Sequence, residues 1–229
     1  MPAESLAPVR RWGRTTAAAT ASLAALGVLS TTGTAHADVV LKLNYPLTGT
    51  TTIKSTNSSM SLGPGTLATA VDDTGGLTAT VDLPPATGSF KEFGVIPVSV
   101  TTEFVEASPT TGTVDINTGA VQTTSHLTIK ITELKVAGIP TPVGGSCRTE
   151  TPAEVSVASD ADFSVINGGN LNGTYTIPKF KDCLLATPLI NLVVPGSGNT
   201  ITLTLGPASV ANSSPTADPS KVFKAGALH

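Results

Sequence analysis

Apolar residues recur at every second position in several separate runs of this chain, and this pattern restricts the possible folds more than any other feature. Leu41, Leu43 and Tyr45 alternate with polar residues, and the same alternation returns between positions 126 and 132. β-Branched residues are common in these runs, and threonine is frequent on the polar side. A period of two places alternate side chains on one face of an extended strand. The runs therefore predict half-buried β-strands.

Clusters of turn-forming residues separate the apolar runs. Asp-Asp-Thr-Gly-Gly stands at 72–76, Asp-Ile-Asn-Thr-Gly at 115–119 and Asn-Gly-Gly-Asn at 167–170. Clusters of this kind connect neighbouring antiparallel strands as hairpins. We therefore expect an all-β protein, built as an antiparallel β-sandwich or a partly closed barrel, with one short helix near the C-terminal third.

The N-terminus has the pattern of a cleavable secretory signal. Three arginines between positions 10 and 14 precede an apolar run at 17–29, and the small residues Ala35 and Ala37 follow. The apolar run is shorter than the roughly 20 residues that a membrane-spanning helix needs. We expect a secreted protein, extracellular or associated with the cell surface, whose mature chain has no transmembrane anchor. The expected divisions are a signal peptide at 1–37, a β-sandwich domain at 38–206 and a flexible tail at 207–229.

The charge balance of the chain argues against two classes of partner. The chain has 13 basic and 16 acidic residues, and the expected mature part keeps 10 and 15 of them, a net charge near −5. Binding to a nucleic-acid backbone or to anionic lipid relies on clustered lysine and arginine. We expect no nucleic-acid partner. A cell-envelope component or an apolar ligand remains a candidate partner.

Cys147 and Cys183 are the two cysteines of the chain. In an oxidising compartment an isolated pair of cysteines favours one disulfide bond, and a reactive thiol is the alternative. The chain-entropy model gives such a bond, which closes a loop of 37 residues, a stabilisation of roughly 4 kcal/mol.

The segment from 184 to 194 is unusually apolar for a loop-rich chain. Thr187 as N-cap, Pro188 at the first helical position and Pro195 as a stop predict a helix of about seven residues. Such a helix would either cover an apolar ligand as a lid or plug one end of the core. The candidate lid residues are Leu184, Leu185, Leu189, Ile190 and Val193.

The sequence offers little for catalysis. A serine hydrolase needs a base beside its nucleophile, and strand alternation places His126 on the face opposite to its apolar neighbours. We therefore expect no catalytic residue and no enzyme. Carboxylates remain as the alternative source of hydrolytic chemistry. These candidates are Glu92, Glu103, Glu106, Glu133, Glu150 and Glu154.

Two pairs of aspartates are the weak candidates for a metal site. Asp72 and Asp73, and Asp160 and Asp162, bring together oxygen ligands that suit calcium. Aspartate also forms turns through hydrogen bonds to nearby backbone amides. We favour the structural role, and we expect no metal site and no cofactor.

Three segments carry a resemblance to other proteins. They read CRTETPA at 147–153, NGGNLNGTYTIP at 167–178 and DCLL at 182–185. This pattern resembles uncharacterised secreted β-rich proteins of high-GC Gram-positive (actinobacterial) bacteria. The resemblance covers most of the mature chain and implies export and a β-rich fold. It transfers no catalytic residue.

From these observations we expect a secreted, non-catalytic β-sandwich protein with a binding or structural role at or outside the cell surface. One alternative is a carrier of an apolar ligand such as a lipid. The other is an extracellular hydrolase that acts through carboxylates. A large apolar cavity would favour the carrier, and two convergent carboxylates in a cleft would favour the hydrolase.

Overall fold

The structure, a computed structural model, describes residues 39–92 and 94–211. The expected signal peptide and residues 212–229 lie outside this part. The strands are β1 (Val39–Ile53), β2 (Ser58–Asp72), β3 (Gly76–Asp82), β4 (Ala86–Glu92), β5 (Ile96–Val114), β6 (Val121–Val136), β7 (Ile139–Pro140), β8 (Arg148–Thr149), β9 (Ala153–Ser159), β10 (Gly169–Ile177), β11 (Phe180–Lys181), β12 (Gly196–Leu205) and β13 (Ser209–Val210). A 3-10 turn, η1 (Leu184–Ala186), and the helix α1 (Thr187–Val193) lie between β11 and β12.

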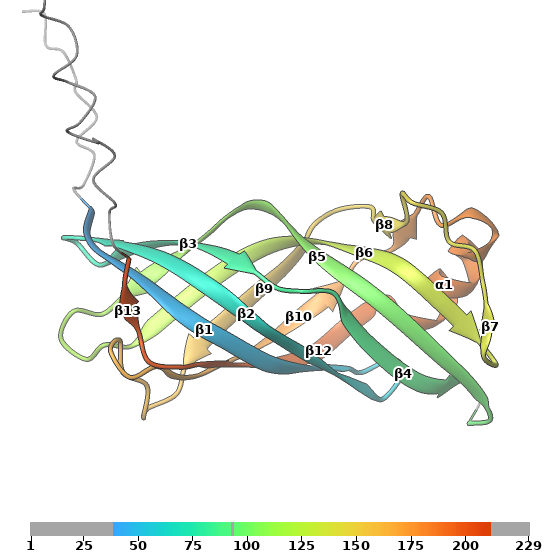
Figure 1. Cartoon of the computed structure of the whole chain (residues 1–229), viewed down its shortest axis with the longest axis horizontal. Coiled ribbons are helices and arrows are strands. Elements are labelled where there is room, and N and C mark those ends of the chain that lie inside the picture. Colours follow the sequence, from blue (N-terminus) through green and yellow to red (C-terminus); the bar gives the residue numbers. More distant parts are fainter. Residues whose placement is uncertain (1–38, 93, 212–229) are drawn as a thin grey trace, which may run out of the picture. The chain divides into compact units, whose positions relative to one another are not determined.

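The long strands form one antiparallel sheet that closes into a barrel (Figure 1). Its eight strand positions run β1, β2, β3 with β4, β5, β6, β9, β10 and β12, and β12 pairs with β1 to complete the circle. β3 and β4 share one position because both pair with β2 and with β5. The predicted all-β antiparallel fold is confirmed, and a closed barrel takes the place of two stacked sheets.

The alternation in the sequence separates the inside of the barrel from the outside. On β1, Leu43, Tyr45 and Leu47 are buried, whereas Lys42 and Asn44 are exposed. β3, β9 and β10 also bury alternate residues. Because interior and exterior residues alternate along every strand of a barrel, the apolar faces together fill its interior. The hydrophobic core of this protein is therefore the barrel lumen.

The expected tight hairpins at 72–76 and 115–119 are present, between β2 and β3 and between β5 and β6. Gly75 has a φ of +85°, a conformation that glycine adopts without strain. The connection between β9 and β10 is longer than the expected turn and occupies residues 160–168. At the other boundary of the expected domain, β13 pairs with β1, so the sheet continues beyond residue 206.

The expected helix forms but begins one residue earlier than predicted. Its N-cap is Ala186, and Thr187 is its first residue. The Thr187 hydroxyl accepts a hydrogen bond from the Cys183 amide and donates one to the Leu184 carbonyl, so it closes η1 instead of capping α1. Asn191 then fastens α1 to β11, since its side chain exchanges hydrogen bonds of 2.7 and 2.8 Å with the backbone of Phe180.

The predicted disulfide between Cys147 and Cys183 is confirmed. Both cysteines are buried, and their Cα atoms are 4.2 Å apart. The bond joins the segment before β8 to the start of η1, and it thereby anchors the chain that leads into α1. In the described part of the chain, no helix has the length and hydropathy needed to cross a bilayer.

Candidate functional site

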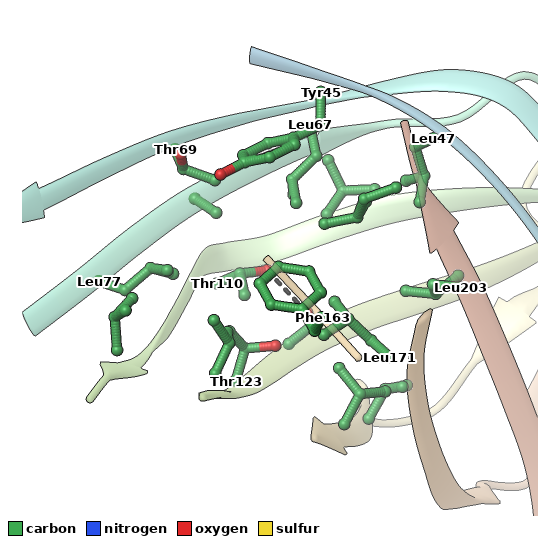
Figure 2. Close-up of a pocket in the computed structure, with 18 of the residues that line it drawn as sticks. Tyr45, Leu47, Leu67, Thr69, Leu77, Thr110, Thr123, Phe163, Leu171 and Leu203 are labelled. Carbon is green, nitrogen blue, oxygen red and sulfur yellow. Dashed lines mark hydrogen bonds between the residues drawn. The ribbon is translucent and has the colours of Figure 1, made fainter. Parts of the chain in front are cut away.

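The barrel lumen contains an apolar cavity of about 70 Å³, here called the loop cavity (Figure 2). Its walls come from β1, β2, β3, β5, β6, β9, β10 and β12 and from residues 160–168. Leucine and valine supply most of the lining, and no lining residue is charged. Hydroxyl groups are the polar component of the lining. They belong to Tyr45, Thr69, Thr110, Thr123 and Ser125.

Most of these hydroxyl groups have partners within the barrel. Thr69 donates to the Leu43 carbonyl at 3.0 Å, and Thr110 and Ser125 share a hydrogen bond of 2.7 Å. Among the described residues, every buried side-chain nitrogen and oxygen has a hydrogen-bond partner. Polar groups with satisfied hydrogen bonds gain little from a polar ligand, whereas the aliphatic walls favour apolar groups. The cavity is therefore chemically suited to hydrocarbon.

Two more apolar cavities follow along the barrel axis. The middle cavity, about 50 Å³, lies beside Met60, Ile129 and Tyr175, and the helix cavity, about 110 Å³, lies between α1 and the ends of β4, β5 and β6. Phe90 and Val194 line both of them. These two side chains therefore form the partition between the middle cavity and the helix cavity.

The loop cavity is closed at its end by residues 160–168, here called the closing loop. Phe163 and Val165 of this loop line the cavity, and Figure 2 shows the Phe163 ring inside it. The Tyr45 hydroxyl donates a hydrogen bond of 2.7 Å to the Val165 carbonyl, and the Ala208 amide donates one of 2.8 Å to the Ile166 carbonyl. At the start of the loop, the Asp160 amide donates a hydrogen bond to the Asn170 carbonyl, and the Asp160 carboxylate accepts one from the Asn172 side chain, so the loop is also fastened to β10.

Two buried tyrosines in the lumen have shifted pKa values. Burial raises the pKa of Tyr45 above its usual value. Burial also raises the pKa of Tyr175, and a hydrogen bond with Thr51 at 2.6 Å partly offsets that rise. Both shifts have the same cause, because a phenolate loses its hydration inside an apolar barrel.

The barrel wall has an interrupted seam where β3 gives way to β4. Backbone pairing between β3 and β5 ends at Ala79 with Thr110, and pairing between β4 and β5 begins at Ala86 with Thr102. In the interval, the Glu106 carboxylate accepts hydrogen bonds from the Val81 amide at 3.0 Å and the Thr110 hydroxyl at 3.3 Å. The Glu106 side chain thus takes the place of backbone pairing between the strands at the point where Val81 and Leu83 line the loop cavity.

The five candidate lid residues are divided between two environments. Ile190 is 4% exposed, and Val193 is partly buried above the helix cavity. Leu184, Leu185 and Leu189 are exposed, by 61%, 98% and 44%. Leu184 and Leu185 belong to η1, which precedes the helix, and Leu189 lines the helix cavity although it is partly exposed.

The candidate catalytic groups are dispersed. The His126 side chain is 44% exposed on β6, and its Nε2 atom lies 3.9 Å from the Glu154 carboxylate. Glu103 pairs across the sheet with Lys130, and Glu133 pairs with Thr101. Among the described residues, Glu92 is the one carboxylate that lines any of the three apolar cavities. Residues 39–92 and 94–211 therefore supply no pair of carboxylates that face one of these cavities.

The candidate metal ligands serve as turn formers or lie apart. Asp72 accepts hydrogen bonds from the Thr74 hydroxyl and from the Thr74 and Gly76 amides. The Thr74 hydroxyl and the Gly76 amide hold the pKa of Asp72 below its usual value. Asp160 instead accepts a hydrogen bond from the Asn172 side chain. In the described ranges, no three or more His, Cys, Asp and Glu side chains lie close enough together to hold a metal ion. Asp73 and Asp162 are therefore not part of such a group either.

The chain was compared with protein-family models, curated proteins and solved structures. No match was found in any of the three comparisons.

The residues that close the loop cavity were not identified from the sequence. Phe163 and Val165 are alternate residues between Asp162 and Asn167, and this short apolar alternation inside a turn-rich segment was their sequence signal. Tyr45 was correctly placed on an inward strand face, but its partner is 120 residues away. For Glu106, the sequence indicated only a carboxylate and gave no sign of its position at the seam.

Proposed function

We propose that this protein is a non-catalytic binding protein that takes up a slender apolar molecule, such as an alkyl chain, in the barrel lumen. The observation that carries the proposal is the lining of the loop cavity, which combines aliphatic walls with hydroxyl groups that mostly have partners. Ligand pockets of this kind in eight-stranded barrels hold one small molecule. A purely structural role would need no such space.

Phe163 occupies the position that the ligand would take. The loop cavity, at about 70 Å³, is smaller than the roughly 150 Å³ that accepts benzene in another protein. The Phe163 ring lies inside the lumen but belongs to the closing loop and not to a strand. Its withdrawal enlarges the cavity without breaking a strand ladder. The proposal is that the ligand displaces Phe163.

The seam between β3 and β5 is the proposed passage into the cavity. Its closure depends on the Glu106 side chain and not on backbone pairing. A side chain rotates on a picosecond-to-nanosecond scale, whereas opening a paired ladder is slow. Val81 and Leu83 adjoin both the seam and the cavity, so a ligand that enters here meets apolar walls at once.

The proposed place of action is outside the cytoplasm. The Cys147–Cys183 disulfide supports this, because such bonds persist in oxidising compartments. The signal-like pattern at residues 1–37 points to the same location. Secretion is thus part of the proposal, and an apolar ligand released from or delivered to the cell envelope fits it.

Filling the cavity by mutation tests the proposal. Ala79 is buried and lines the loop cavity, so Ala79→Leu places three additional carbons in the lumen. We expect this variant to lose at least tenfold of its affinity for a fluorescent fatty acid, while Phe163→Ala binds the same probe more tightly. Melting curves establish that both variants are folded.

Ala158→Leu is the matched control for Ala79→Leu. Ala158 is exposed on β9, so the same carbons are added on the outside of the barrel. The control should bind the probe as the unmodified protein does. Equal probe affinity in the two alanine variants would contradict a ligand site in the lumen.

A further inference from the structure

The end of the barrel at α1 displays an apolar surface. Leu192 is 76% exposed, and it lies in the same short segment as three other exposed leucines. We call these four residues, Leu184, Leu185, Leu189 and Leu192, the leucine surface. Val95, in the turn between β4 and β5, and Ile139, on β7, are also exposed, and β7 lies at the same end of the barrel as α1 (Figure 1). Single exposed leucines are common on proteins, but several within one short segment are a candidate binding surface.

Five lysines lie next in sequence to residues that contact the helical segment or line the helix cavity. Phe180 is bound by Asn191 of α1, and Lys179 and Lys181 are its neighbours in the chain. The side chain of Ser55 donates a hydrogen bond to Val194 at the end of α1. Lys54 precedes Ser55, Lys91 follows Phe90 of the helix cavity, and Lys135 lies between two further residues that line it. Each lysine is therefore adjacent to a residue that packs on or bonds to the helical segment.

Charge is divided between the two ends of the barrel. Of the described residues, the α1 end has six basic ones, the five lysines and Arg148, and four acidic ones, Glu92, Glu133, Glu150 and Asp182. Arg148 is paired with Asp182 at 3.4 Å. The opposite end has Lys42 and five aspartates, Asp72, Asp73, Asp115, Asp160 and Asp162. The net charge of the whole chain is negative and argued against binding to anionic lipid. The α1 end nevertheless has more basic than acidic residues.

We infer that the α1 end docks on an anionic lipid surface. The leucine surface would enter the boundary between headgroups and acyl chains, and the five lysines would lie at the level of the phosphates. Interfacial binding combines these two contributions, buried apolar area and attraction of basic residues to anionic lipid. The acidic aspartates at the opposite end would be directed away from the membrane, so the charge distribution also orients the barrel. This inference does not depend on a ligand in the lumen.

The test measures partition of the full chain onto lipid vesicles. Leu185→Ser with Leu192→Ser removes two outward side chains and leaves buried Ile190 in place. On vesicles that contain phosphatidylglycerol, we expect at least a tenfold loss of partition. Lys91→Gln with Lys135→Gln should lose roughly fivefold for each lysine, and added salt should remove this difference. Phosphatidylcholine vesicles should bind the unmodified protein more weakly.

Matched controls come from the opposite end of the barrel. Ile166 and Val210 are exposed there, so Ile166→Ser with Val210→Ser removes similar apolar surface, and Lys42→Gln removes a lysine. Both controls should retain partition. All variants keep residues 1–38, so any contribution of that segment to vesicle partition is the same in each of them. Equal partition of the leucine variant and its control overturns the inference, as does equal binding to both lipids. Loss of self-association with unchanged partition would assign the surface to a second copy and would also overturn it.

Discussion

The hydroxyl group of Tyr45, on the first strand of the barrel, donates a 2.7 Å hydrogen bond to the backbone carbonyl of Val165 in the closing loop. The bond joins residues 120 positions apart, and it holds the loop that carries Phe163 into the loop cavity. The backbone bond between Ala208 and Ile166 and the hydrogen bonds of Asp160 with Asn170 and Asn172 hold other parts of the loop, whereas the bond from Tyr45 comes from within the lumen. This relationship connects the closure of the cavity to the core of the fold.

Tyr45→Phe tests this relationship. The phenyl ring keeps the apolar contacts of Tyr45, and the variant loses only the bond to Val165. We expect the free energy of unfolding to fall by about 1 kcal/mol and the dissociation of a bound fatty-acid probe to become faster. Chemical denaturation and stopped-flow fluorescence measure the two effects. Tyr175→Phe, which loses its bond to Thr51 in the middle cavity, is the control and should leave probe dissociation unchanged.

The two tyrosines also predict how stability depends on alkaline pH. Burial raises the pKa of both above 10.0, so the folded state retains protons that the unfolded chain releases at high pH. Their contribution to stability is fully present below the unfolded pKa and is lost as the pH rises through the folded pKa. Denaturation measured from pH 8 to 11 should show this decline, and Tyr45→Phe or Tyr175→Phe should each make it shallower. If stability declined as steeply in both variants as in the unmodified protein, the tyrosines would be excluded as the source of the decline.

Glu106 is expected to control the rate of ligand uptake at the seam. Glu106→Ala removes the acceptor for the Val81 amide, so this amide should exchange its hydrogen faster and a fatty-acid probe should bind faster. Glu106→Gln retains an acceptor oxygen and should remain close to the unmodified protein. Hydrogen exchange and probe association kinetics provide the two measurements. Unchanged association in Glu106→Ala, with faster exchange of Val81, would move the passage elsewhere in the barrel.

The two sides of α1 should respond differently to a charge. Ile190 is 4% exposed above the helix cavity, so Ile190→Asp buries an unpaired carboxylate and should cost several kcal/mol of stability. Leu189→Asp, at a residue that is 44% exposed, should cost about 1 kcal/mol or less. Thermal melts of the two neighbouring variants test this difference. Equal losses would show that both side chains are required by the core.

The local part of this fold was predictable from the sequence, and the long-range part was not. The alternation at Leu43 and Tyr45 predicted which side chains point inward, because the strand period is a local property. Two turns were recognisable from Asp72 and Asp115 for the same reason. The contact between β1 and β12 that closes the barrel joins Leu47 to Leu205, and the tilt and register of all strands together determine it.

The sequence pointed to the apolar segment at α1 but not to the loop cavity. That segment contains Ile190 and Val193, which line the helix cavity, whereas Leu184 and Leu185 lie in η1, ahead of the helix, and are mostly exposed. Phe163, which fills the cavity, was missed because a loop side chain is directed inward by tertiary packing and by the distant Tyr45. Sequence periodicity contains no information on such a contact.

The most direct test of a lumen ligand site is to locate a bound alkyl chain relative to the methyl groups of the barrel. Isotope-filtered NOE spectra of the protein with a saturated fatty acid report methyl groups within about 5 Å of the ligand, by the ordinary reach of the effect. Contacts to Leu171, Leu203 and Val157, which line the loop cavity, are the predicted result. Contacts confined to Leu185 and Leu192, on the outside of the α1 end, would contradict a ligand site in the lumen.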